Sequence, residues 1–71
     1  MKEIREISEL IREYVLSQQS GRIQGVVSHL LGSGYAHRGA RDLRIITRNE
    51  LENMQFEGLV VTEGEVYRTT G

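Results

Sequence analysis

The stretch Leu51-Glu52-Asn53-Met54-Gln55-Phe56-Glu57-Gly58-Leu59-Val60 joins a helical pattern to a β-prone one. Leu51 and Met54 are spaced for one face of a helix, and Glu57-Gly58 follows where that pattern stops. Residues 59–62 are then β-prone. We therefore expect the chain to pass from a helix directly into a strand at this point.

The helical pattern extends upstream to about Ala40. Its apolar positions share one side at about 100° per residue: Leu43, Ile46, Leu51 and Met54. Three arginines fall on roughly the opposite side: Arg41, Arg44 and Arg48. Thr47-Arg48-Asn49-Glu50 is a capping-box sequence, which would let the helix start only at Arg48 and leave residues 43–46 extended. We favour the longer helix, and the shorter one is the alternative.

Downstream, two β-prone runs, residues 59–62 and 65–69, surround Glu63-Gly64. This pattern predicts a hairpin over about residues 58–70, with glycine in the turn. An isolated hairpin is only marginally stable, so we expect it to lean on the helices. The residues expected to face inward are Leu59, Val61 and one of Val66 or Tyr67.

Two amphipathic helices are expected before this region. Apolar residues at helical spacing predict a helix over about residues 2–18, followed by Gly21, which is suited to a left-handed cap. A second, shorter helix begins near Ile23 and is stopped by Gly32-Ser33-Gly34. Residues 32–40 contain three glycines and are expected to form an irregular turn or loop.

Helix, helix, turn, helix and hairpin in one short chain resemble the winged helix-turn-helix family of small DNA-binding regulators. Many of its members close their recognition helix with a Leu-x-x-Leu-x-x-x-Gly-Leu-Val run, and residues 51–60 are similar to it. The resemblance implies a single α+β domain over residues 1–71, a three-helix winged helix-turn-helix with a C-terminal two-stranded β-hairpin wing. The expected core residues are Ile7, Leu10, Ile11, Val27, Leu30, Leu51, Met54 and Leu59.

The charges of the chain are segregated, although the net charge is only −1. Residues 21–48 carry five arginines and one aspartate, a net charge of +4, whereas residues 49–71 carry one arginine and five glutamates, a net charge of −4. Such segregation indicates where a polyanion could dock. In the alternative reading, the arginines lie in a solvated loop and pair with the acidic C-terminal third.

The resemblance also implies a site. The third helix would enter the major groove of double-stranded DNA and present its N-terminal residues to base edges and phosphates. The N-terminus of the second helix and the turn around Tyr35 would lie near the DNA backbone, where His37 could contact phosphate or stack. The candidate nucleic-acid-binding residues are Arg38, Arg41, Arg44, Arg48, Asn49, Tyr35 and His37.

Two features depart from the family pattern. The turn before the third helix is longer than the usual three or four residues. The wing tip, Glu63-Gly64-Glu65, is acidic and would be repelled by phosphate, so we expect it to stay off the DNA or to meet a protein. A winged-helix protein–protein interaction module that does not bind DNA is therefore the alternative function. Binding of RNA, with Tyr35 and His37 stacking on splayed bases, is a third reading.

The chain lacks the residue patterns of catalysis, and we do not expect an enzyme. There is no cysteine, and His29 and His37 have no cysteine or carboxylate cluster in the sequence to form a metal site, so no metal or cofactor is expected. The N-terminus alternates charged with apolar residues. We therefore expect no signal peptide and no membrane helix there, and the pattern favours a cytoplasmic protein. A homodimer, at least on DNA, is expected from the small footprint of a 71-residue reader.

Overall fold

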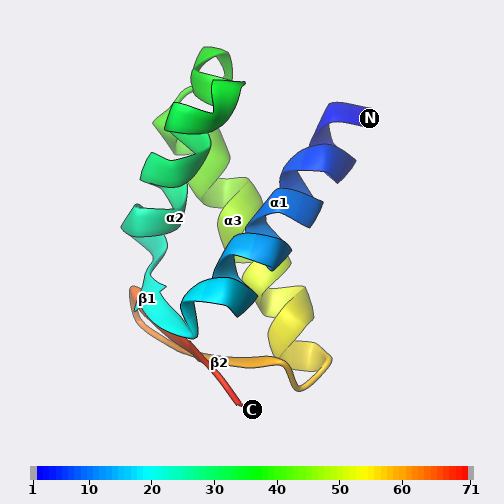
Figure 1. Cartoon of the computed structure of the whole chain (residues 1–71), viewed down its shortest axis with the longest axis vertical. Helices are drawn as coiled ribbons and strands as arrows, with labels where there is room; N and C mark the ends of the chain where they lie inside the picture. The colour runs from blue at the N-terminus through cyan, green and yellow to red at the C-terminus, as the bar shows by residue number, and fades with distance from the viewer. Residues whose placement is uncertain (1, 71) are drawn as a thin grey trace.

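A computed structural model describes residues 2–70. These residues form an α+β fold in which three helices lie beside one another and a small antiparallel sheet crosses one end of them (Figure 1). The helices are α1 (Lys2–Gln18), α2 (Ile23–Leu30) and α3 (Ala40–Phe56), and the strands are β1 (Ser20–Arg22), β2 (Val60–Glu63) and β3 (Val66–Thr69). The predicted architecture of three helices with a C-terminal hairpin wing is confirmed.

Helix α3 is the longer of the two predicted alternatives. It begins at Ala40 directly after Gly39, whose φ of 84° is a conformation that favours glycine. Thr47 lies inside the helix and is completely buried, so it cannot act as the cap of a helix starting at Arg48. Burial of Leu43 and Ile46 in the core accounts for the helical turns that precede Thr47.

The connection between α2 and α3 is more regular than the predicted loop. It consists of a wide helical turn, η1 (Leu31–Tyr35), and a 3-10 turn, η2 (Ala36–Arg38). Gly34 interrupts these turns with a φ of 101°, and Gly39 ends them. The predicted turn over residues 32–40 is therefore present, but it is formed by two short helical turns that are separated at Gly34 rather than by an irregular loop. Gly34 and Gly39 redirect the chain, and Tyr35, directly after Gly34, also leaves helical geometry with a φ of −110° and a ψ of 17°.

A third strand, β1, was not predicted. It pairs antiparallel with β3, which lies in the middle of a sheet of order β1-β3-β2. The predicted left-handed cap at Gly21 is wrong, because Gln19 adopts the positive φ, 69°, after α1. Gly21 instead allows close packing: a Cβ atom at this position would lie 2.8 Å from the hydroxyl oxygen of Tyr67.

The hairpin has the predicted extent but a different inward face. Val60 and Tyr67 are buried, whereas Val61 and Val66 are exposed, so the expectation that Val61 faces inward is wrong. Side chains alternate along a strand, and Val60 therefore places Val61 on the solvent side. Of Val66 and Tyr67, between which the sequence did not decide, Tyr67 faces inward.

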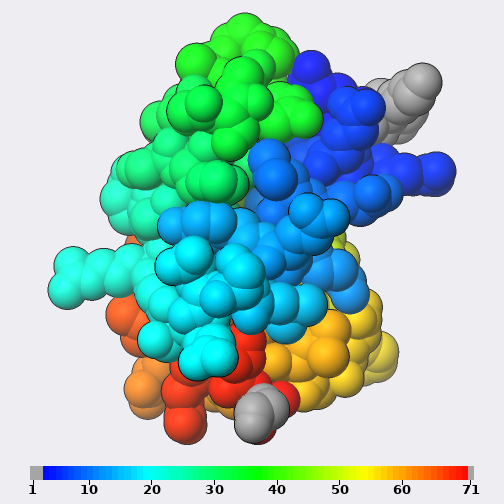
Figure 2. Space-filling model, viewed as in Figure 1, coloured from blue at the N-terminus to red at the C-terminus, as the bar shows by residue number. Residues whose placement is uncertain are grey.

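The core is continuous through all three helices and the hairpin. Of the predicted core residues, Leu10 and Leu59 are half-buried and pack against its edge, and the others are buried. The buried apolar residues are Ile7, Ile11, Val15, Ile23, Val26, Val27, Leu30, Leu43, Ile46, Leu51, Met54, Val60 and Tyr67. Figure 2 shows α1 lying across one face of the molecule, with the hairpin at the lower edge of that face. Among the described residues, no helix is long and apolar enough to cross a membrane.

An ion-pair cluster joins α1 to the C-terminal half of α3. Arg12 donates from Nε to Glu50 at 2.9 Å and from its two terminal nitrogens to Glu57 at 2.8 and 3.0 Å. Glu50 is buried, and Arg12 is the cation that compensates its charge. The hydrogen bonds from Arg12 lower the pKa of the Glu57 carboxyl below its ordinary value.

Replacing Leu51 with Ala should lower the free energy of unfolding by about 2–5 kcal/mol, because the change leaves a cavity in the core. Leu16→Ala is the matched control, since Leu16 is 43% exposed, and its cost should stay near 1 kcal/mol or less. Denaturant titration of the wild type and both variants measures the difference. Equal losses in the two variants would show that Leu51 is not a core residue.

The Arg12–Glu57 pair should make stability depend on pH. Because the folded-state pKa of Glu57 lies below 4.5, the pair stabilises the fold above that pH and loses its contribution as the pH falls through the lowered pKa. The melting temperature of Glu57→Gln should therefore fall less on acidification below about pH 4.5 than that of the wild type. Glu13→Gln, at an exposed site on α1 without an ion pair in the described residues, should retain the wild-type dependence.

Candidate nucleic-acid interface

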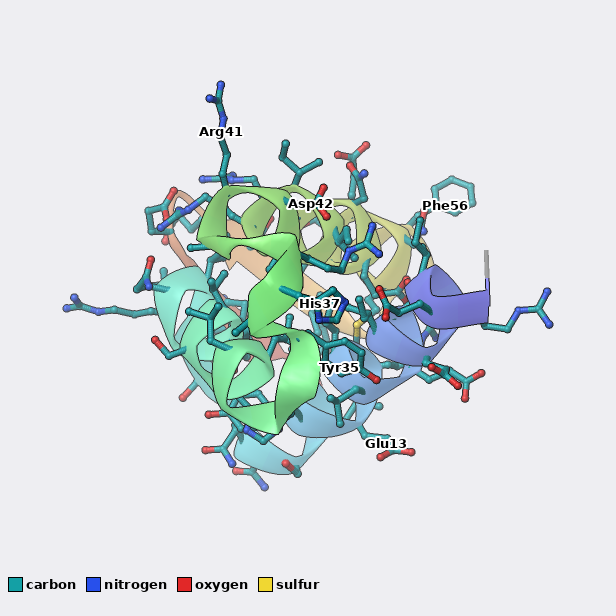
Figure 3. The ribbon with its side chains drawn as sticks, turned by 90° about the horizontal axis from the view of Figure 1, so that it is seen from above. Glu13, Tyr35, His37, Arg41, Asp42 and Phe56 are labelled. Atoms are coloured by element: carbon teal, nitrogen blue, oxygen red, sulfur yellow. The ribbon has the colours of Figure 1, made fainter. Side chains whose placement is uncertain are left out.

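Four of the predicted site residues lie on the part of α3 that faces away from the core. Arg41, Arg48 and Asn49 are exposed and Arg44 is half-buried. Arg41 makes no ion pair or side-chain hydrogen bond with the described residues, and Figure 3 shows its side chain projecting away from the fold. Residues 41–49 of α3 therefore present one unpaired guanidinium, two further arginines and an amide on the side away from the core.

Arg44 and Arg48 converge on a single carboxylate at the tip of the hairpin. A terminal nitrogen of Arg44 lies 2.6 Å from one carboxylate oxygen of Glu65, and Arg48 pairs with the other oxygen. The second terminal nitrogen of Arg44 donates to the Gln24 side chain at 2.6 Å. The hydrogen bond from Arg44 and the charges of both arginines lower the pKa of Glu65.

The hairpin tip is held against the helices. The backbone N–H of Ile23 donates to the carbonyl oxygen of Glu65 at 2.8 Å, and Gly64 makes the turn with a φ of 63°. Farther along the hairpin, Thr62 donates from its backbone N–H and its hydroxyl to the side-chain oxygen of Gln55 at 2.9 and 2.7 Å. These contacts position the Glu65 carboxylate beside α3, while Glu63 on the preceding strand is exposed.

Two predicted site residues, Arg38 and His37, belong to a different cluster. Arg38 is half-buried and donates to Glu3 at 2.6 Å and to Asp42 at 2.8 Å. His37 lies 3.1 Å from the same Glu3 carboxylate. These contacts tie η2 to α1 and lower the pKa of Glu3, mainly through Arg38, so the charges of this cluster are largely satisfied within the protein.

Tyr35 is an edge residue of the core. It is half-buried and packs against the buried cluster, and its ring lies 6.4 Å from that of His37 at a tilt of 45°. The connection that carries Tyr35, His37 and Arg38 lies at the opposite end of the helices from the hairpin (Figure 1). The structure therefore gathers Arg44 and Arg48 near the hairpin tip and keeps Tyr35, His37 and Arg38 away from it, with Arg38 and His37 paired to α1.

The alternative reading of the charge segregation holds only in part. Its solvated loop is wrong for Arg41, Arg44 and Arg48, because all three lie in α3. Arg44 and Arg48 pair with the acidic C-terminal third, as the alternative reading expects, whereas Arg41 has no such partner in the described residues. Arg22, which directly precedes α2, is also exposed and close in sequence to Gln24. Gln24, which accepts a hydrogen bond from Arg44, was not predicted from the sequence. A glutamine is uncharged, so it does not appear in an analysis of charge segregation.

Apolar side chains interrupt the polar outer face of α3. Ile45 is 53% exposed and Phe56 is 94% exposed, and Figure 3 shows Phe56 projecting from the helix into solvent. Such large exposed apolar groups are common at protein contacts. The outer face of α3 therefore combines guanidinium groups suited to phosphate with apolar groups suited to another protein.

The hollows of the described surface are shallow. One of about 390 Å³ lies between α1, α2 and the sheet and includes Tyr14 and Tyr67, and a smaller one of about 150 Å³ separates α3 from the hairpin beside Arg48. Within residues 2–70, no group of three or more metal-ligating side chains comes together. No protein-family model, curated protein or solved structure matches the chain.

Proposed function

We propose that the protein binds double-stranded DNA through the N-terminal half of α3, as a regulator of transcription or replication of the winged-helix type. The observation that carries the proposal is the outward placement of Arg41, Arg44 and Arg48 on one helix whose opposite side is buried. A helix of about 10–12 Å diameter fits the major groove, which is about 12 Å wide. The hairpin would then lie beside the groove.

Each residue has a role that suits its chemistry. Arg41, which is unpaired in the described structure, can bridge the O6 and N7 atoms of guanine or hold a phosphate. Asn49, one turn beyond Ile45, can bridge N6 and N7 of adenine. Arg44 and Arg48, beside the N-terminal end of α2, would contact the DNA backbone. Arg38, His37 and Tyr35 are not part of the proposed contact. Arg38 pairs with Glu3 of α1 and Asp42 of α3, His37 pairs with Glu3, and Tyr35 packs against the edge of the core.

A homodimer on DNA belongs to the same proposal. One copy offers a single 17-residue reading helix, and small readers commonly gain affinity by pairing across a palindrome. Two copies would then place their α3 helices in successive major grooves on one face of the duplex, about 34–36 Å apart.

Replacing Arg41 or Arg48 with Ala should weaken DNA binding without unfolding the protein, because both side chains are exposed. A lost phosphate contact lowers affinity for all sequences and reduces the salt slope by about one, whereas a lost base contact costs about 1–3 kcal/mol at one position. Fluorescence anisotropy with random and selected duplexes over a salt series distinguishes the two. Arg5→Ala on α1 is the control, and wild-type affinity in both α3 variants would refute the proposal.

The exposed apolar residues of α3 favour a second candidate, a protein-interaction module whose partner is a second copy of the chain. Arg41 and Glu52 are both without an ion pair in the described residues and are eleven residues apart, three helical turns or about 16.5 Å. Antiparallel packing of two α3 helices would bring each Arg41 to the partner's Glu52, with Ile45 near the two-fold axis. This contact would cover the DNA-binding face.

Sedimentation in the absence of DNA separates the two candidates. If α3 pairs with itself, the wild type should sediment as a dimer, and Ile45→Ser should shift it towards the monomer because the apolar centre of the contact is lost. Leu16→Ser, at an exposed apolar site on α1, should leave the distribution unchanged. A wild-type monomer at all concentrations would exclude this candidate, whereas DNA binding by the Ile45→Ser monomer would support the first.

A further inference from the structure

The Glu65 carboxylate occupies a position that suits a different anion. Arg44 and Arg48 approach it from one helix, and together they carry two positive charges against its single negative charge. Gln24 does not neutralise either arginine, because its side chain is uncharged. It only orients the guanidinium of Arg44, which donates a hydrogen bond of 2.6 Å to the Gln24 side-chain oxygen. The cluster therefore keeps an excess of one positive charge when Glu65 is in place.

The cluster is open to exchange with solvent. The side chains of Arg44, Arg48 and Glu65 are 36%, 47% and 51% exposed, respectively. Ion pairs at this exposure contribute little to stability and are screened by salt, so the carboxylate can leave without unfolding the hairpin. The bond from the Ile23 N–H holds the backbone of Glu65 rather than its side chain, so only the side chain needs to rotate.

We propose that Arg44 and Arg48 form an oxyanion site which Glu65 fills in the free protein and which a phosphate of the DNA backbone takes over on binding. This inference rests on the proposed DNA-binding function. It adds that the Glu65 carboxylate competes with DNA phosphate for Arg44 and Arg48. A phosphodiester resembles the carboxylate in presenting two oxygens and one negative charge to paired guanidinium donors. DNA has the further advantage that each neutralised phosphate releases condensed counterions.

Competition from Glu65 would make binding selective. An isolated anion must displace the tethered carboxylate at a cost, whereas a duplex that also engages Arg41 and Asn49 gains contacts that offset the displacement. The site therefore raises the threshold for weak, purely electrostatic binding. Glu63, on the same hairpin, forms no ion pair within the described residues and provides a matched carboxylate without this function.

Glu65→Gln tests the inference, with Glu63→Gln as the control that makes the same change in net charge. Glu65→Gln should bind duplex DNA on the order of 3- to 10-fold more tightly than Glu63→Gln at low salt, a gain that corresponds to one or two exposed ion pairs. Its salt slope should be steeper than that of Glu63→Gln, because added salt screens the ion pairs of Glu65 and so weakens a competition that only Glu63→Gln retains. Adding Arg44→Gln to Glu65→Gln should remove most of the gain. Thermal melts confirm that each variant is folded.

Inorganic phosphate provides a second measurement that does not depend on DNA binding. Titration of Glu65→Gln should shift the NMR signals of the Arg44 and Arg48 Nε–H groups at lower phosphate concentrations than in the wild type or Glu63→Gln. If phosphate binds this way but no variant binds DNA, the oxyanion site stands and the proposed function fails. If the wild type binds DNA but Glu65→Gln gains no more than Glu63→Gln and shows no preference for phosphate, the function stands and this inference is overturned.

Discussion

Burial of one side of α3 is the constraint on which the rest of the structure depends. The helix packs against α1, α2 and β2, and its inner side supplies buried residues along most of its length. In a chain of 71 residues there is little other apolar surface to bury, so α3 cannot rotate about its axis without losing core contacts. Its opposite side is consequently presented to solvent, and with it the arginines of the candidate interface.

The charge segregation of the sequence is resolved into three local clusters. Arg12 joins Glu50 and Glu57, Arg38 joins Glu3 and Asp42, and Arg44 and Arg48 join Glu65. The first two clusters tie α1 to α3 and to the turn before it. The third joins the hairpin tip to the candidate interface and is the only one of the three with more arginines than carboxylates, which is why it is the one suited to an external anion.

Periodicity predicted the elements but not how every residue within them is oriented. The three helices and the hairpin follow from the 3.6-residue and two-residue patterns, and both long helices have nearly the predicted bounds. The β1 strand has only three residues and no recognisable alternation, so it becomes a strand only because β3 lies beside it. A shift of one residue along a strand exchanges its inward and outward faces. The β-prone run Leu59-Val60-Val61-Thr62 has apolar residues on both faces, so the sequence does not indicate which face is buried.

The sequence by itself determined the class of fold, the helical region that carries the arginines and the position of the acidic turn, because these properties depend on local spacing and composition. Only the tertiary structure decided which arginines are available. Arg38 and Arg41 are three residues apart, yet Arg38 pairs with Glu3 of α1 whereas Arg41 projects into solvent. The pairing of Arg44 and Arg48 with Glu65 joins residues 21 and 17 positions apart. Such contacts depend on how the helices and the hairpin pack, so they cannot be predicted from the local sequence pattern.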